Sequence, residues 1–411
     1  MINLTEKLTP LKQTSLYIHI PYCKKKCSYC DFYSTKLSSN TEIEAVLSRI
    51  LDDTETILHK LERPEIKTLF IGGGTPSSIP LDLLENFLKK INLLIKSSPI
   101  ESTIELNPET VNKDLLGIIS ANGIQRVSVG VQSLDERVLR TLGRNTDALT
   151  TLEGLEIIRK HWKGSLSIDL INAVPGQTIT SSLSDIERID KFNPDHISLY
   201  SLTFEPATEL YSKLKAGKIS TLSEITDLKM QIESLELLES LGYKRYEISN
   251  FAKEGKSSLH NLNYWNMGSY LGVGPSAAST LLTGSGPVRL IYNRSISNFI
   301  GSSSLEDRFN IEYLEPDSFL LEHLMMGFRL INGVKPDHIN NVFDIDLINY
   351  LEPIFIKWNE MLIIETGSIR LTNNGLSLLN PFLIDIAALI ADNHLQISGK
   401  EINWPILTAQ F

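Results

Sequence analysis

The feature that most constrains this 411-residue chain is a regular alternation of short β-rich runs and longer helical patterns across its first 250 residues. Six runs carry a strand pattern, at 15–20, 68–71, 102–106, 126–129, 166–170 and 196–199. Helical patterns follow them at 41–61, 81–95, 113–122, 135–160, 180–191 and 222–241. Such alternation indicates a parallel sheet with helical crossovers and favours a barrel. A complete barrel needs eight units, so the sequence predicts an α/β fold with an incomplete (βα)6 barrel.

The alternation stops after Ser249, and this predicts three regions: 1–250, 251–315 and 316–411. The middle region is rich in Gly, Ser and Asn over 255–305, and we interpret it as a connecting segment of loops with short elements. The last region shows helical patterns at 319–332, 337–341, 345–359 and 376–391, and a hairpin pattern at 362–371. These patterns predict a small, mostly helical, winged-helix-like C-terminal domain, a fold that does not by itself indicate DNA binding.

Charge and hydropathy exclude several classes of function. The chain has 39 Lys and Arg against 49 Asp and Glu, a net charge of −10, which disfavours a nucleic-acid partner. No apolar run reaches the roughly 18 residues that a transmembrane segment requires, although peripheral membrane contact remains open. The start of the chain is polar and has no apolar signal core, so we expect a cytoplasmic protein.

The three cysteines of the chain lie together, directly after the first predicted strand, in HIPYCKKKCSYCDFYS. An odd number of cysteines at this spacing cannot form a disulfide framework, and free thiols imply a reducing compartment. Thiolates are soft ligands for iron–sulfur clusters or zinc, and structural zinc wants four ligands where this chain has no fourth cysteine. We therefore predict that Cys23, Cys27 and Cys30 are metal ligands, and three thiolates on a four-iron cluster leave one iron open.

Glycines and polar residues follow the other predicted strands. The run GGGTP at 72–76 comes after the second strand, and glycines there let a ligand approach the backbone closely. Five further candidates lie at or after later strands: Glu105, Gln132, Arg144, Asp169 and Thr203. In βα barrels the carboxyl ends of the strands carry the active site, so we expect these residues and the cysteines at one mouth.

The Cys-x3-Cys-x2-Cys run and the glycine loop resemble the signature of radical S-adenosylmethionine (radical SAM) proteins. The resemblance implies a [4Fe–4S] cluster whose open iron binds the amino and carboxylate groups of S-adenosylmethionine (SAM). Electron transfer from the cluster then cleaves the sulfonium and gives a 5′-deoxyadenosyl radical. The residues implied for cofactor binding are Tyr17, Tyr29, Gly73, Gly74, Thr75, Glu105, Gln132, Arg144, Asp169 and Thr203.

Among these residues, the resemblance places the glycine loop at the methionyl amino group and pairs Arg144 with the SAM carboxylate. Glu105, Gln132 and Asp169 would bind the ribose or adenine groups. Tyr17 and Tyr29 would lie beside the methionyl end and the adenine.

Longer segments are similar to the oxygen-independent coproporphyrinogen III oxidase-like subfamily, among them YIHIPYC, FIGGGTPS, IELNPE and SIDLINAVPGQT, over about 17–379. The oxidase branch has a fourth cysteine two residues after the third, where this chain has Phe32. The run HNLNYW at 260–265 resembles the His-Asn-x-x-Tyr-Trp motif of a heme chaperone branch. That resemblance implies that His260 ligates heme iron, with Tyr264 and Trp265 against the porphyrin.

Three functions follow as hypotheses. The leading one is a radical SAM-type heme chaperone that binds a [4Fe–4S] cluster, SAM and heme, and delivers heme to apo-hemoproteins. The alternative is an oxygen-independent coproporphyrinogen III oxidase that decarboxylates propionates, and the third is an iron–sulfur sensing regulator. The sequence leaves open whether the chain is an enzyme. The expected partners are heme or a porphyrin, apo-hemoproteins, and a small electron-transfer protein that acts as reductant.

Overall fold

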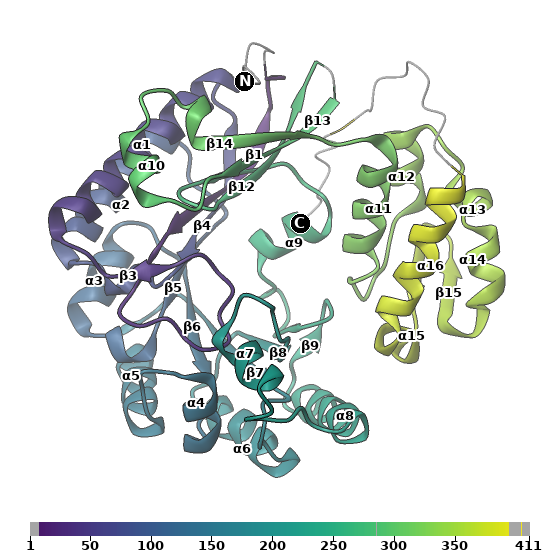
Figure 1. The fold of residues 1–411 in the computed structure, drawn as a ribbon, viewed down its shortest axis with the longest axis horizontal. Helices are drawn as coiled ribbons and strands as arrows, with labels where there is room; N and C mark the ends of the chain where they lie inside the picture. Colours follow the sequence, from purple (N-terminus) through teal and green to yellow (C-terminus); the bar gives the residue numbers. More distant parts are fainter. Residues whose placement is uncertain (1–7, 285, 394–403, 405–411) are drawn as a thin grey trace.

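The computed structural model describes residues 8–284, 286–393 and 404, and its centre is an open parallel sheet (Figure 1). Neighbouring strands run in the order β1 (Gln13–Ile20), β4 (Glu65–Gly73), β5 (Glu101–Leu106), β6 (Arg126–Gln132), β7 (Ser165–Asn172) and β8 (His196–Ser201). Every pairing among these six is parallel. The predicted incomplete (βα)6 barrel is confirmed.

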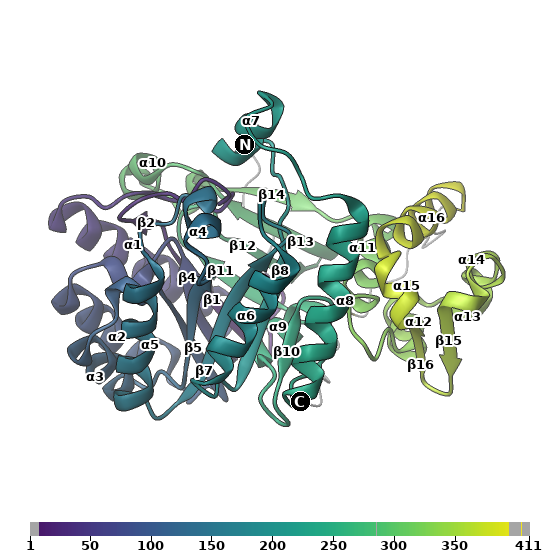
Figure 2. The same cartoon turned by 90° about the horizontal axis from the view of Figure 1, so that it is seen from below.

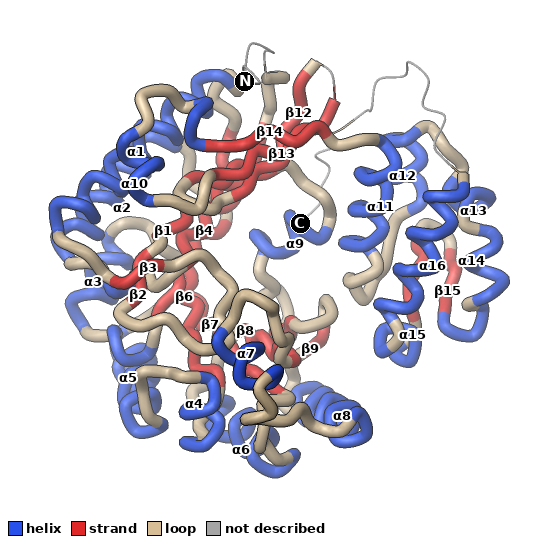
Figure 3. Tube along the Cα trace, viewed as in Figure 1, coloured by secondary structure: helices blue, strands red, loops and turns tan. Residues whose placement is uncertain are grey.

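Helices cover the outer face of this sheet, as the blue segments around the red strands show (Figure 3). They are α1 (Asn40–Lys60), α2 (Leu81–Ile95), α3 (Lys113–Ala121), α4 (Glu136–Leu142), α5 (Ala148–His161), α6 (Ile179–Asp190) and α8 (Glu224–Ser240). The long pattern over 135–160 divides at Gly143, which has a φ of 70° and ends α4. A further helix, α7 (Glu209–Lys215), was not predicted and projects above the barrel mouth (Figure 2).

The segment after β8 extends the sheet, which corrects the prediction of loops over 255–305. The strands β9 (Lys244–Arg245) and β10 (Asn250–Ala252) lie beside β8. On the other edge β11 (Tyr270–Val273) pairs parallel with β1, and β12 (Ala278–Thr283), β13 (Gly286–Tyr292) and β14 (Phe309–Tyr313) follow antiparallel. Among them, β11 is held by pairing with β1, far back in the chain, and local composition carries no trace of that pairing.

Between β10 and β11 the chain enters the concave side of the sheet as α9 (Leu259–Trp265), which lies against β4 (Figure 1). Buried polar side chains surround the start of α9. Glu101 and Arg126 form an ion pair at 3.0 Å, with side chains only 6% exposed. The Glu101 carboxylate also accepts hydrogen bonds from the Ser258 hydroxyl and from the backbone N–H of His260. This buried pair therefore fixes the start of α9.

The C-terminal part contains α11 (Pro316–Gly327), α12 (Pro336–Phe343), α13 (Leu347–Tyr350), α14 (Glu352–Lys357), α15 (Asn373–Ser377) and α16 (Leu379–Asp392). The predicted hairpin is present as β15 (Leu362–Glu365) and β16 (Ser368–Leu371), which turn at Gly367 with a φ of 86°. The apolar side chains of these helices and of the hairpin form a second hydrophobic core, separate from the core under the large sheet. Within the described part of the chain, no helix combines the length and apolar character needed to cross a bilayer.

Candidate site for an iron–sulfur cluster and SAM

The three cysteines lie on the loop after β1, between the short paired strands β2 (Tyr22–Cys23) and β3 (Thr35–Lys36). All three are free and half-buried. Burial raises the pKa of Cys23, and it raises the pKa of Cys30 to about 11. Buried thiols with raised pKa values gain most from a metal, which binds and stabilises the thiolate.

The three thiols are the donor type that iron–sulfur clusters take. In a [4Fe–4S] cluster each cysteine binds a different iron. Two polar groups touch the sulfurs: the Thr75 hydroxyl is 3.5 Å from Cys23 Sγ, and Arg144 Nη1 is 3.7 Å from Cys27 Sγ. The donor set therefore fits a cluster, whose potential such contacts tune.

The glycine loop after β4 packs directly on the cysteine loop. The backbone N–H groups of Gly74 and Thr75 donate to the carbonyl oxygens of Ile20 and Tyr22, at 2.8 and 2.7 Å. A Cβ atom on Gly74 would stand 2.5 Å from the Tyr22 carbonyl oxygen, so only glycine fits there. Gly73 has a φ of 110°, a conformation that side chains disfavour. These glycines bring the backbone of the loop close to the cysteines, so a ligand bound beside the cysteines could contact that backbone.

Two carboxyl groups face the interior of the mouth. Glu105, on β5, accepts the backbone N–H of Gly73 at 3.0 Å, and Asp169, on β7, accepts the Ser128 hydroxyl at 3.2 Å. Burial, together with the negative charge of Asp169, raises the pKa of Glu105 to about 8. Burial also raises the pKa of Asp169 to about 6. Two carboxyl groups that are costly to ionise make a site that a cationic, hydroxyl-bearing ligand would stabilise.

Arg144 lies between these carboxyl groups and the cluster loop. Its side chain is 5% exposed, and Nη2 donates to the Gly130 carbonyl oxygen at 2.7 Å. Its Nε and the nearby Glu109 Oε2 are buried without hydrogen-bond partners in the described structure. A buried donor that lacks a partner costs free energy, so a carboxylate ligand would be favourable here.

The remaining predicted residues are distributed around the same mouth. Gln132 ends β6 with a φ of 67°, a strained conformation for a residue with a side chain. Tyr29 packs against the small apolar cluster of α4 and β7, and the charges of Arg144 and Asp169 act on its hydroxyl. The Tyr17 hydroxyl lies 3.0 Å from His19 Nδ1, and the charge of Glu105 raises the pKa of Tyr17 beyond the effect of burial. Thr203 lies in the exposed loop after β8.

Two residues that we did not select from the sequence join the site. The Asn107 side chain accepts from both Arg144 Nη atoms, at 3.5 and 3.4 Å, and donates to the Thr75 hydroxyl at 3.3 Å. His19 Nε2 lies 2.9 Å from the Tyr33 carbonyl oxygen and so ties β1 to the end of the cysteine loop. Asn107 lies in the motif IELNPE, which was a usable signal, whereas His19 reads in the sequence as one more strand residue.

His260 is buried in the interior of this structure, and its expected ligation of heme iron stays a prediction. Its side chain is 1% exposed, and both ring nitrogens are engaged, Nδ1 with the Thr68 hydroxyl at 2.7 Å and Nε2 with the Tyr264 hydroxyl at 2.9 Å. Burial lowers the pKa of His260 to about 3, so the ring is neutral. Ligation of heme iron by this imidazole would require that the hydroxyl of Thr68 or of Tyr264 gives up its hydrogen bond.

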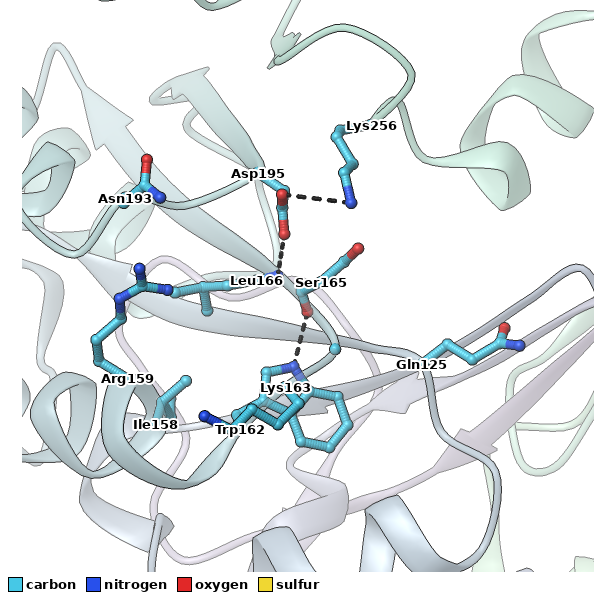
Figure 4. Close-up of a pocket in the computed structure, with 11 residues that line it drawn as sticks. Gln125, Ile158, Arg159, Trp162, Lys163, Ser165, Leu166, Asn193, Asp195 and Lys256 are labelled. Carbon is cyan, nitrogen blue, oxygen red and sulfur yellow. Dashed lines mark hydrogen bonds and ion pairs between the residues drawn. The ribbon is translucent and has the colours of Figure 1, made fainter.

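A cavity of about 390 Å³ lies at the other end of the barrel, around the amino ends of β6, β7 and β8 (Figure 4). Arg159, Lys163 and Lys256 line it, and Lys256 pairs with Asp195 at 3.6 Å. None of the residues predicted for the site lines this cavity. It is therefore remote from the cysteines.

Comparisons with known proteins place the chain in a family. The profile of the Radical SAM superfamily matches residues 17–191. The heme chaperone HemW of Buchnera aphidicola subsp. Acyrthosiphon pisum is 33% identical over 382 residues, which cover 91% of this chain and 98% of the relative. HemW of Escherichia coli is 33% identical and covers 80% of this chain and 84% of the relative. The mitochondrial radical S-adenosyl methionine domain-containing protein 1 of Danio rerio is 34% identical, and the match covers 79% of this chain and 75% of the relative.

The solved structure of coproporphyrinogen III oxidase (HemN) from Escherichia coli has the same fold. It superposes with a TM-score of 0.75 at 20% identity, over 91% of this chain and 89% of the other. The fold likeness and the extent of the sequence matches agree with the cysteine and glycine motifs. The chain is therefore a member of the radical SAM superfamily and, within it, of the family of the heme chaperone HemW.

Proposed function

We propose that the protein is a heme chaperone that carries a [4Fe–4S] cluster and SAM, binds heme and delivers it to apo-hemoproteins. One observation carries the proposal: a cluster and SAM site without the oxidase branch's fourth cysteine, in a chain related to HemW over nearly its whole length. At the position of that cysteine stands Phe32, whose side chain is 69% exposed on the cysteine loop. This feature supports the chaperone over coproporphyrinogen oxidation.

The proposal assigns a role to each part of the site. Cys23, Cys27 and Cys30 would hold the cluster, which supplies one electron at a time when bound. The backbone of Gly73, Gly74 and Thr75 would line the methionyl end of SAM, because that loop packs on the cysteine loop. Arg144 would pair with the SAM carboxylate, and Tyr17 would lie beside the methionyl end. The residues that would orient the rest of the cofactor are Tyr29, Glu105, Gln132, Asp169 and Thr203.

The proposed reductant is a small acidic electron-transfer protein. Lys24, Lys25 and Lys26 are exposed between the first two cysteines. The α7 helix brings further lysines to this loop, because Leu210 N donates to the Ser28 carbonyl oxygen at 2.8 Å. Complementary charge speeds the encounter of such partners. Iron–sulfur chemistry and free thiols support a reducing compartment, and we propose the cytoplasm.

Anaerobic reconstitution followed by heme titration tests the proposal. The parent protein should contain about four irons and four sulfides and should bind heme near stoichiometrically. Replacement of any one of Cys23, Cys27 and Cys30 by Ala should remove the cluster absorption. Multiple-turnover decarboxylation of coproporphyrinogen III without heme binding would favour the oxidase instead. Full iron content after a single cysteine replacement would contradict the ligand assignment.

A further inference from the structure

Two histidines in the C-terminal core have no part in the site described above. His323 lies on α11 and His338 on α12, two helices that pack side by side (Figure 1). Their ring centroids are 6.2 Å apart. In each ring Nε2 is buried, and within the described residues neither Nε2 has a hydrogen-bond partner. Because buried polar atoms are almost always paired in folded proteins, two unpaired nitrogens on neighbouring rings indicate a missing partner.

The hydrogen bond of His323 determines which of its nitrogens carries the proton. Nδ1 lies 2.8 Å from the carbonyl oxygen of Phe319, which can only accept, so Nδ1 donates. Burial lowers the pKa of His323 to about 3, so the ring is neutral and Nε2 presents a lone pair. A histidine that binds a metal has the same arrangement, in which one nitrogen donates to a carbonyl oxygen and the other binds the ion.

The surroundings of His323 offer this lone pair no proton. The imidazole meets the rings of Phe319 and Phe343 edge to face, at centroid distances of 4.4 and 5.1 Å, and a phenyl ring has no N–H or O–H group. The indole of Trp404 packs on Phe319 at 5.3 Å, but its Nε1 donates to the Met267 carbonyl oxygen at 3.0 Å. A bare lone pair in an apolar core costs free energy, and a bound cation would recover it.

The separation of the two rings fits one ion held between them. His338 is neutral as well, because burial and the positive charge of Lys335 lower its pKa. A metal lies about 2 Å from an imidazole nitrogen, which sets the centroids of two ligating rings about 6.3 Å apart in linear geometry and about 5.1 Å apart in tetrahedral geometry. The observed 6.2 Å agrees with the linear arrangement. Among the described residues, no further His, Cys, Asp or Glu completes a group of three that could hold a metal.

We propose that His323 and His338 form a two-coordinate site for a cuprous ion, Cu(I), which both Nε2 atoms bind. Imidazole nitrogen suits copper, whereas structural zinc takes four ligands. Free thiols imply a reducing compartment, where copper is monovalent and accepts two ligands in a line. The ion would join α11 to α12 and so stabilise the C-terminal core. The site is separate from the cysteine loop and does not depend on the proposed chaperone function.

Anaerobic titration with Cu(I) against a chromophoric cuprous chelator tests the site. The background is the full-length chain with Cys23, Cys27 and Cys30 replaced by Ala, because these are its only thiols and thiolates compete for copper. This protein should bind one Cu(I) per chain. Its copper X-ray absorption spectrum should show two nitrogen neighbours and no sulfur. The same spectrum is expected from the cluster-loaded parent, in which the cluster occupies the thiolates.

Single histidine variants in this background locate the ion. His323→Gln and His338→Gln should each weaken Cu(I) binding about tenfold or more. The side chain of His338 is only partly buried, so His338→Gln tests the site even if His323→Gln does not fold. Cu(I) should raise the denaturation midpoint of the background but not that of His338→Gln. His161→Gln, at an exposed position on α5, is the matched control and should bind copper like the background.

Four results would overturn the proposal. They are no binding of Cu(I) by the background, sulfur neighbours in its copper spectrum, background affinity in His338→Gln, and Zn(II) rather than Cu(I) held by the two histidines. The first result would leave a water molecule as the partner of the two nitrogens. Heme titration of His338→Gln with its cysteines intact should match the parent, so failure of the copper site would leave the proposed function standing.

Discussion

Glu105 and Asp169 show how single residues acquire their properties from position. Each is an ordinary carboxylate in the sequence, and each becomes hard to ionise because the barrel mouth buries it, with the charge of Asp169 adding to the effect on Glu105. The sequence could predict that both lie at the mouth, because both end parallel strands. It could not predict their coupling, which depends on the lateral pairing of β5, β6 and β7.

The raised pKa of Glu105 gives a stability prediction with a defined sign. Between its ordinary pKa of 4.5 and its folded value of about 8, the folded protein binds more protons than the unfolded chain. Without SAM, the free energy of unfolding should therefore fall as the pH rises through this window. Glu105→Gln should abolish this pH-dependent loss of stability, and at pH 8 its free energy of unfolding should exceed that of the parent by about 4 kcal/mol.

Denaturant unfolding at pH 5 and pH 8 measures this difference. At pH 5 the parent and Glu105→Gln should nearly coincide, since Glu105 is then mostly protonated. Asp169→Asn is the matched comparison, and its gain over the parent should develop over about pH 4–6 and then stay constant at higher pH. Equal stability of Glu105→Gln and the parent at pH 8 would contradict the buried, costly carboxylate.

The same carboxyl groups give a prediction for the cofactor. Asp169→Ala and Glu105→Ala should each weaken SAM binding by about 1–3 kcal/mol, because a buried hydrogen-bond partner is lost. The perturbation of the reduced cluster's EPR signal by SAM measures binding. Lys163→Ala is the control, because Lys163 lies at the opposite end of the barrel. Unchanged SAM binding in both carboxyl variants would remove these residues from the site.

At the scale of elements, α9 is a helix whose position in the fold could not be predicted from its local sequence pattern. Its His-Asn-x-x-Tyr-Trp motif is visible in the sequence, but the concave face on which it lies is not. The six central strands were predictable because each carries its own apolar pattern. The strand β11 and the placement of α9 depend on partners far along the chain, such as β1 for β11 and Thr68 and Glu101 for His260.

The contacts of α9 predict that His260 acts through stability. Tyr264→Phe removes only the hydroxyl that lies 2.9 Å from His260 Nε2, and so leaves a buried nitrogen without its partner. This should lower the free energy of unfolding by about 1–3 kcal/mol. Chemical denaturation measures the loss. A heme affinity that collapses while the free energy of unfolding stays at the parental value would instead support His260 as a heme ligand.

At the scale of the whole molecule, charge is distributed unevenly. The chain carries a net charge of −10, yet three consecutive exposed lysines lie in the cysteine loop. The neighbouring helix α7 adds Lys213 and Lys215, and it is tied to the loop by the 3.0 Å hydrogen bond from the Ser28 hydroxyl to Glu209. An acidic molecule with a basic rim at its redox centre should repel an acidic donor everywhere else and attract it there.

This distribution predicts how the cluster is reduced. Replacing Lys24, Lys25 and Lys26 together by Glu should slow reduction by an acidic [2Fe–2S] ferredoxin at least tenfold at low salt, and the difference should shrink as ionic strength rises. The loss of cluster absorbance in stopped flow measures the rate. A matched control replaces Arg159, Lys160 and Lys163 by Glu, which changes the net charge equally at exposed positions remote from the cysteines. Reduction by a small neutral photoreductant should be equal in all three proteins, because no oriented docking is involved. Equal slowing by the two triple variants would mean that net charge, and not a docking face, controls the encounter.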